Sequence, residues 1–219
     1  MKRLIYILLA CLLPYMAQAQ ESVIVIQAQE SANNRLEPIM VHAYSSSIYH
    51  TIVLDTLIPK RELVTFAYVV RPSFEPEYAL VYNQHKKKLI YSEVASSATN
   101  IWYSFFENEN YTVNRWELKV DPELAESMRV LVRTAIATAV APKNDSILPM
   151  IGEDGTTYQF IANNYTAECW SPDSGNNAEL VRIMDAVCQA IKNKNPALLQ
   201  TLRPDINRLA SLYDKYVCR

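Results

Sequence analysis

The spacing of apolar residues changes at Asp121, and this change constrains the fold more than any other feature of the chain. Before it, Trp116, Leu118 and Val120 alternate with charged residues, as the two faces of a strand do. After it, apolar residues recur every three or four positions over 124–139, which is the spacing of one helix face. Strands followed by helices favour an α+β fold.

The first half of the chain predicts an antiparallel sheet. Runs of β-branched and aromatic residues alternate with turn sequences such as Arg71-Pro72-Ser73. We expect strands at 23–26, 39–42, 63–70, 77–82, 89–94, 101–106 and 112–120. Because the last of them alternates apolar and charged residues, one face of the sheet is expected to lie in water. The segment 45–57 fits a helix and a strand equally well.

The second half predicts helices and one hairpin. Asp121 suits a helix N-cap and Pro122 the first helical position. We expect a helix from there to near Pro142, a hairpin at 157–162 and 165–170, and helices at 177–192 and 204–217. The predicted fold is therefore α+β, an antiparallel sheet packed against one long helix with a helical C-terminal part. It forms a single domain over 20–219, sheet-rich over 22–120 and mostly helical over 121–219.

Residues 1–19 have the features of a signal peptide. Lys2 and Arg3 precede a short apolar run, and Ala17-Gln18-Ala19 forms an A-x-A cleavage site. The apolar run is too short to span a bilayer, which needs about 20 apolar residues. We therefore expect an exported protein, periplasmic or secreted, without a transmembrane segment after cleavage. The alternative is a lipoprotein, in which Cys11 would become the lipidated first residue.

Charge and glycine content exclude several kinds of partner. The chain has 21 Lys+Arg and 23 Asp+Glu, and cleavage removes Lys2 and Arg3, which leaves 19 against 23, a net charge of −4. Nucleic acid and anionic membranes require clustered positive charge, so neither is expected as a partner. The chain has only 3 Gly, too few for a nucleotide-binding glycine loop, and no cofactor is predicted.

Three cysteines follow the predicted cleavage site. Cys169 lies on the second strand of the hairpin, and Cys188 lies on the apolar face of the next helix. Both would point into the space between these elements, so a disulfide between Cys169 and Cys188 is expected in an oxidising compartment. Pairing of Cys188 with Cys218 and three reduced, buried thiols are the alternatives. Their spacing does not fit a zinc site, and no metal is predicted.

Several segments together resemble a family of uncharacterised exported bacterial proteins. The resemblance covers residues 64–192, and its most specific part is Asp154-Gly155-Thr156-Thr157-Tyr158, a hairpin, Trp170-Ser171-Pro172 and a helix. It implies an extracytoplasmic α+β domain and brings no reaction with it. The same residues have simpler structural roles, because Asp154-Gly155 favours a turn and the two aromatic residues can pack the hairpin.

Two kinds of enzyme can be drawn from the sequence. A hydrolase could use a histidine with Ser45-Ser46-Ser47, although the chain lacks a G-x-S-x-G motif. The candidate histidines are His42, His50 and His85. A glycosidase would need two carboxylates about 5 to 9.5 Å apart in a cleft. The candidates are Glu75, Glu77, Glu107 and Glu109. Neither pattern is specific, so no catalytic residue is predicted.

Aromatic residues favour a binding module over an enzyme. They concentrate in the expected sheet and could stack sugars or hold a protein partner, although they could equally form its core. The sheet residues are Tyr78, Tyr82, Tyr91 and Trp116. Next to a polar segment, Trp102, Tyr103, Phe105 and Phe106 form the candidate interaction surface. We therefore expect a non-catalytic exported module that binds a protein or a glycan, with a hydrolase of cell-envelope or dietary glycan or peptide as the alternative.

Overall fold

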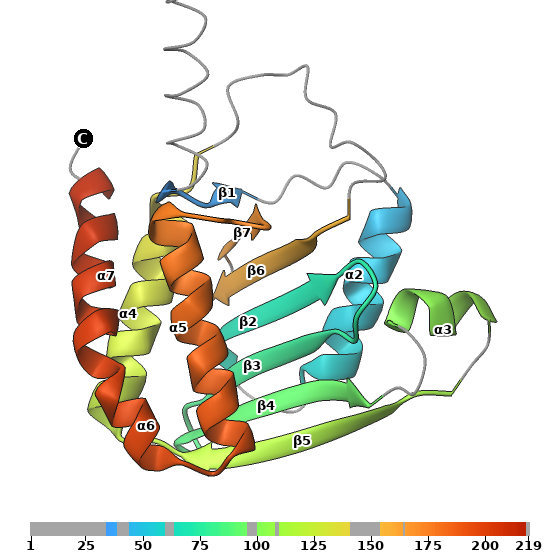
Figure 1. The fold of residues 1–219 in the computed structure, drawn as a ribbon, viewed down its shortest axis with the longest axis horizontal. Coiled ribbons are helices and arrows are strands. Elements are labelled where there is room, and N and C mark those ends of the chain that lie inside the picture. The colour runs from blue at the N-terminus through green and yellow to red at the C-terminus, as the bar shows by residue number, and fades with distance from the viewer. Residues whose placement is uncertain are drawn as a thin grey trace, which may run out of the picture.

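The computed structural model describes residues 34–38, 44–59, 64–95, 100–107, 110–140, 154–163 and 165–217. In these ranges seven strands form one antiparallel sheet, in the order β1-β7-β6-β2-β3-β4-β5 (Figure 1). The strands are β1 (Glu37–Pro38), β2 (Val64–Pro72), β3 (Tyr78–Asn83), β4 (Lys88–Ala95), β5 (Thr112–Lys119), β6 (Thr156–Ala162) and β7 (Tyr165–Trp170). The helices are α2 (Tyr44–Leu57), α3 (Ile101–Glu107), α4 (Pro122–Ala137), α5 (Gly175–Lys192), α6 (Pro196–Thr201) and α7 (Arg203–Val217). The fold is α+β, as expected.

One face of the sheet packs against α4 and α5, and α7 packs against these two helices. Phe66, Tyr68 and Val70 of β2 point to this face, and the alternation of β3 adds Leu80 and Tyr82. The apolar sides of the helices close over them, and α4 follows the predicted spacing, with Leu124, Met128, Leu131 and Val132 buried. Burying a side chain of this size contributes about 1.5–3 kcal/mol, so this core supplies much of the stability.

The opposite face of the sheet is covered by α2 and α3. A second, smaller core lies there, built of small side chains from the sheet and larger ones from the helices. Its fully buried members are Ala67, Val69, Ala79, Val81 and Val94 from the strands with Val53, Leu57 and Ile101 from the helices. The prediction that one face lies in water is therefore wrong for β2, β3 and β4, because the segment that fitted both a helix and a strand forms α2 and shields them. On β5 the charged residues Arg115, Glu117 and Lys119 are exposed, as expected.

α5 crosses the strands instead of running along them (Figure 1). Near its start, the amide of Asn177 donates to the carbonyl of Arg35, just before β1, and accepts from the hydroxyl of Tyr213 on α7. At its end, Lys192 forms an ion pair with Glu93 of β4. The helix thus passes from the β1–β7 side of the sheet to the β4–β5 side.

Residues 101–106 form helix α3, so the strand predicted there is wrong. A short apolar run does not distinguish the two structures, and the residue before it decides for a helix. Asn100 acts as the N-cap, because its Oδ1 accepts a hydrogen bond from the backbone N–H of Tyr103 at 3.1 Å. The strands expected at 23–26 and 39–42 and the signal peptide expected at 1–19 lie outside the described residues.

Candidate functional site

Five aromatic rings form a continuous row across the face of the sheet that α5 crosses, and we call this row the tyrosine band. Tyr158 of β6 stacks on Tyr68 of β2, with ring centroids 6.2 Å apart. Tyr78 of β3 lies 6.4 Å from Tyr68 and 5.9 Å from Tyr91 of β4. Trp116 of β5 ends the row, 5.5 Å from Tyr91. Five neighbouring strands thus contribute one ring each.

The pairing of the strands explains why these rings meet. Neighbouring strands lie about 4.8 Å apart, and side chains on one face are in contact with direct and diagonal partners. Tyr91 lies directly opposite Trp116. Tyr68 lies opposite Leu80, which makes it a diagonal neighbour of Tyr78. The alternation of each strand therefore places the aromatic residues in register on one face.

Asp185 of α5 lies over the middle of the tyrosine band. Its Oδ1 accepts hydrogen bonds from the hydroxyls of Tyr68 and Tyr78, each at 2.9 Å. Burial raises the pKa of the Asp185 carboxyl, and the two hydrogen bonds oppose this only in part. Burial and the nearby carboxylate also raise the pKa of both tyrosines, so their hydroxyls remain protonated donors.

A second carboxylate, Glu93 of β4, lies toward the β5 end of the band. Its Oε2 accepts from the hydroxyl of Tyr91 at 2.6 Å and from Nζ of Lys192 at 2.7 Å. Burial alone would raise the pKa of Glu93, but these two hydrogen bonds lower it. The Lys192 ammonium also lies over the rings of Trp116 and Tyr91, 5.3 and 6.0 Å from their centroids. Here the band holds a cation between a carboxylate and two rings.

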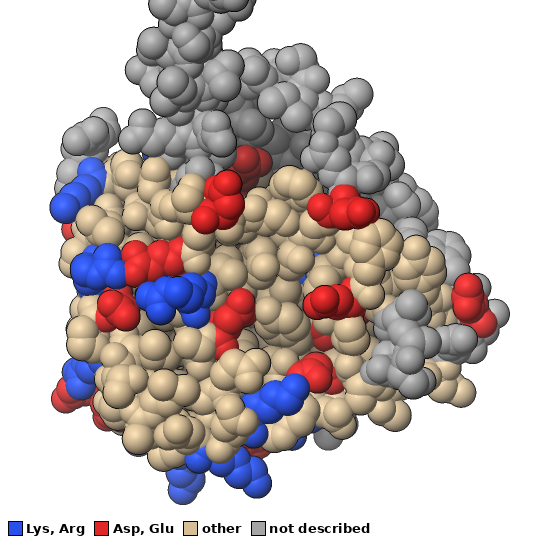
Figure 2. Space-filling view, in the orientation of Figure 1, with Lys and Arg blue, Asp and Glu red and all other residues tan. Residues whose placement is uncertain are grey.

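The tyrosine band is partly open to solvent. Tyr68 and Tyr91 are buried, whereas Tyr78, Trp116 and Tyr158 are half-buried. To the right of α5 in Figure 1, none of the described helices covers the front of the strands. Figure 2 shows Asp and Glu side chains across the middle of this face, while Lys and Arg lie mainly toward its left and lower edges. The open part of the band is therefore aromatic and acidic.

The sequence identifies the rings of the band better than the charges. Tyr78, Tyr91 and Trp116 belong to the predicted aromatic set of the sheet, with the core as the alternative. Tyr91 is part of the core and the other two pack against it, while a binding role for them stays a prediction. Asp185 and Lys192 were missed. The signal for Asp185 is its place on α5, four residues after Val181, because a carboxylate beside the apolar helix face needs polar partners across the interface.

The predicted interaction surface lies on α3, on the other side of the molecule's sheet. Tyr103 and Phe105 are 42% and 49% exposed, whereas Ile101 is buried in the second core. Trp102 and Phe106 belong to the same helix, and their side chains lie outside the described residues. The exposed rings are compatible with a contact surface, and binding of a partner there stays a prediction.

The disulfide expected between Cys169 and Cys188 is absent from the structure, where both are buried free thiols. The direction of α5 explains this. Cys188 lies close to Tyr68, Tyr78 and Tyr91, which are on β2, β3 and β4. Cys169 is on β7, two to four strands away, or about 10–19 Å. A disulfide requires Cα atoms within about 7 Å. Cys218 and Cys11 lie outside the described residues.

His50 of α2 belongs to a half-buried polar cluster on the second face of the sheet. Its Nε2 lies 3.3 Å from Nε2 of Gln159. Burial, followed by the positive charge of Arg71, lowers the pKa of His50 to about 4. Arg71 forms an ion pair with Glu168 at 2.9 Å, and burial raises the pKa of Glu168. Among the described residues no carboxylate bonds to His50, which differs from the histidine–carboxylate pair expected for a hydrolase.

The other candidate catalytic residues are dispersed. His85 is exposed in the β3–β4 turn, and Glu107 is exposed at the end of α3. Glu77 is fully buried, and its carboxyl accepts from the backbone N–H of Ile101 and the hydroxyl of Tyr49. A carboxyl used in this way supports the fold. His42, Glu109 and the side chains of 45–47 lie outside the described residues.

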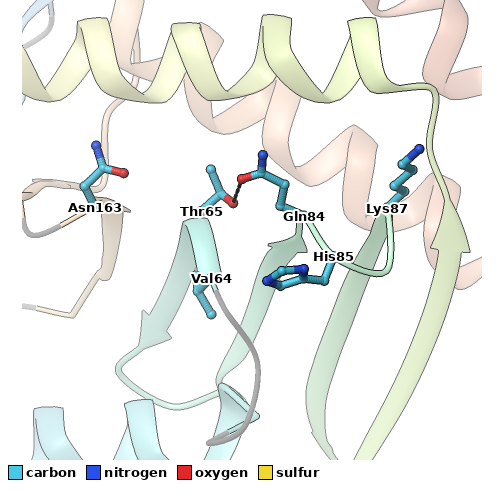
Figure 3. Close-up of a pocket in the computed structure, with 6 residues that line it drawn as sticks. All are labelled: Val64, Thr65, Gln84, His85, Lys87 and Asn163. Atoms are coloured by element: carbon cyan, nitrogen blue, oxygen red, sulfur yellow. Dashed lines mark hydrogen bonds between the residues drawn. The ribbon is translucent and has the colours of Figure 1, made fainter.

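An open pocket of about 610 Å³ lies where β2 begins and β3 and β6 end (Figure 3). By the strand registers this is the opposite end of these strands from Tyr78 and Tyr158. Its lining residues are Val64, Thr65, Gln84, His85, Lys87 and Asn163. The hydroxyl of Thr65 donates to Oε1 of Gln84 at 3.3 Å, and the two side chains point toward each other (Figure 3). The pocket offers a histidine and a lysine, and none of these six residues is a carboxylate.

Comparisons with known proteins supply no family for this chain. No family model matches the sequence, and no curated protein matches it. The resemblance to exported bacterial proteins therefore stays a prediction. In the described ranges no group of three or more His, Cys, Asp or Glu side chains could hold a metal ion, and no helix is long and apolar enough to cross a membrane.

Proposed function

We propose that the protein is an exported, non-catalytic module that binds a glycan through the tyrosine band. The observation that carries this proposal is the row of rings from five neighbouring strands, with Asp185 and Glu93 among them. Export rests on the signal peptide expected at residues 1–19.

The chemistry of the band suits a sugar. A sugar ring has a face of C–H groups that can lie on an aromatic ring, and hydroxyls around its rim that donate hydrogen bonds. Tyr78 and Tyr158 offer half-buried rings, and the carboxyl of Asp185 is an acceptor with more than one lone pair. Ligand sites typically combine an apolar wall with a few well-placed polar groups in this way.

The extent of the band favours an oligosaccharide over a single sugar. Its half-buried rings Tyr158, Tyr78 and Trp116 lie on β6, β3 and β5, and from β6 to β5 there are four strand spacings, or about 19 Å. Protein interfaces usually depend on a few aromatic or arginine anchors. The exposed aromatic side chains of the described residues lie outside the band, on α3 (Tyr103 and Phe105), on β7 (Tyr165 and Trp170) and at Phe74.

Binding can be tested by calorimetry and thermal unfolding of the isolated protein with a panel of soluble oligosaccharides. At a concentration of 100 times its dissociation constant, a ligand adds about 2.7 kcal/mol to the free energy of unfolding and raises the melting temperature. We expect such a shift with at least one oligosaccharide. The Tyr158→Ala variant, which removes a half-buried ring from the band, should lose most of this affinity.

Phe105→Ala provides the matched control, because it also removes a partly exposed ring, from α3. It is expected to bind the same sugar as the unchanged protein does. If Phe105→Ala weakens binding and Tyr158→Ala does not, the glycan site lies on α3 and not on the band. If no oligosaccharide of the panel binds, the proposed function is wrong.

A further inference from the structure

A lysine side chain contacts the β5 end of the tyrosine band but not the β6 end. At the β5 end, the Lys192 ammonium lies 2.7 Å from Oε2 of Glu93 and over the rings of Tyr91 and Trp116. A cation in contact with a carboxylate and the faces of aromatic rings is held by charge and by cation–π attraction together. The β5 end of the band thus accommodates an ammonium group, that of Lys192.

The β6 end of the band has the same components without a cation. Tyr158 and Tyr78 supply the rings, and Asp185 supplies the carboxyl. Neither Lys nor Arg from the described ranges bonds to Asp185, whose hydrogen-bond partners are the hydroxyls of Tyr68 and Tyr78. A second carboxylate, the exposed Glu75, lies near enough to Tyr158 for its charge to raise the pKa of the tyrosine hydroxyl.

Neutral donors leave the Asp185 carboxylate poorly compensated. Removing a carboxylate from water is costly unless an opposite charge replaces the lost solvation. The tyrosine hydroxyls supply part of that solvation, and both bond to Oδ1. An ammonium group placed against Asp185 and the ring of Tyr158 would complete it, as Lys192 does for Glu93.

We infer that the β6 end of the tyrosine band, at Asp185, Tyr78 and Tyr158, binds the ammonium group of an amino sugar. The inference rests on the proposed glycan-binding function and specifies its ligand. A neutral sugar uses the rings and accepting oxygens alone, whereas an amino sugar with a free amine adds an ion pair and a cation–π contact at this position.

The test compares two tetrasaccharides that differ only at nitrogen, β-1,4-linked glucosamine and its fully N-acetylated form. Calorimetry on the unchanged protein at a pH where the amine is charged should show at least tenfold tighter binding of the glucosamine form. Asp185→Asn keeps an acceptor for the tyrosine hydroxyls and removes the charge. It should bring the affinity for the glucosamine form down to that for the acetylated form, and leave the acetylated form unaffected.

Asp214→Asn is the matched control, since it removes one negative charge from an exposed position on α7. It is expected to preserve the preference for the free amine. Equal binding of the two sugars to the unchanged protein overturns the inference and leaves glycan binding intact. Loss of both sugars in Asp185→Asn also overturns it, because Asp185 would then act by holding the tyrosines. If neither sugar nor any other oligosaccharide binds, the proposed function itself fails.

Discussion

His50 lies among groups that oppose its protonation. The side chain is half-buried, and the guanidinium of Arg71 is close enough to repel a second positive charge. Nε2 of His50 lies 3.3 Å from the side-chain amide nitrogen of Gln159. The imidazole is therefore neutral at physiological pH, and its protonation at lower pH should destabilise the folded protein.

The sign of that effect follows from the two pKa values. Burial and Arg71 lower the pKa of His50 from 6.5 to about 4 on folding. The unfolded chain then binds the proton more readily, so stability from this group is fully present above about pH 6.5 and is lost as the pH falls toward 4. We expect the imidazole of His50 to titrate near pH 4 in NMR spectra.

The same linkage can be measured in unfolding experiments. Because carboxyl groups also titrate in this range, the quantity to compare is the difference between the protein and its His50→Gln variant. The free energy of unfolding of the unchanged protein should fall more steeply between pH 7 and pH 4. His85→Gln, at an exposed position in the β3–β4 turn, should retain the steep dependence. Identical pH profiles for all three proteins would contradict this prediction.

At the scale of elements, one buried carboxyl joins three segments on the second face of the sheet. Glu77, just before β3, accepts from the N–H of Ile101 at the start of α3, at 2.8 and 3.0 Å to its two oxygens. It also accepts from the hydroxyl of Tyr49 on α2, at 2.6 Å. α3 is short, so its position depends on such contacts more than on its intrinsic helical stability.

Removing this acceptor should destabilise the protein. Hydrogen bonds to a charged group contribute about 1.5–3 kcal/mol each, and Glu77→Ala also takes the acceptor away from a buried N–H. We expect the free energy of unfolding in urea to fall by about 3 kcal/mol. Glu75→Ala, two residues earlier at an exposed position, should change it by less than about 0.5 kcal/mol. Equal effects of the two substitutions would show that Glu77 does not hold these elements together.

Elements were predictable where a periodic pattern extended over many residues. The helix after Asp121, the hairpin before α5 and the strand containing Trp116 each have such a pattern, and each is found in the structure. Residues 101–106 are too few to display a period, and their helix depends on Asn100 and on Glu77, which is distant in sequence. The residues around 101–106 do not indicate the contact with Glu77, so α3 could not be predicted from the local sequence.

The candidate site required knowledge of the whole molecule. The sequence predicted that Tyr78, Tyr91 and Trp116 belong to the sheet, and the alternation of β3, β4 and β5 places them on one face. It could not show that β6 joins the sheet beside β2, which brings Tyr158 onto Tyr68. Nor could it show that α5 crosses the strands and carries Asp185 to the middle of the row. Both facts concern the order and direction of elements, which one sequence does not specify.

The path of α5 also determines the state of the cysteines. The helix begins beside β7, where Cys169 lies, but Cys188 comes thirteen residues after its first residue, or about 20 Å along the helix. Each thiol is then buried beside carboxylates and not beside the other thiol. Burial, with Glu168 and Glu37, raises the pKa of Cys169 to about 12, and burial raises the pKa of Cys188 well above its usual value.

Alkylation distinguishes this arrangement from a disulfide. The thiolate is the reactive form, and the folded protein exposes almost none of it at about pH 8. We expect iodoacetamide to leave Cys169 and Cys188 unmodified in the native protein, and to modify both once guanidinium chloride unfolds it without reductant. Peptide mass spectrometry assigns each position separately, and a reduced, unfolded sample defines complete labelling. Recovery of the Cys169 and Cys188 peptides joined by a disulfide from the unreduced protein would mean that α5 packs closer to β7 than this fold allows.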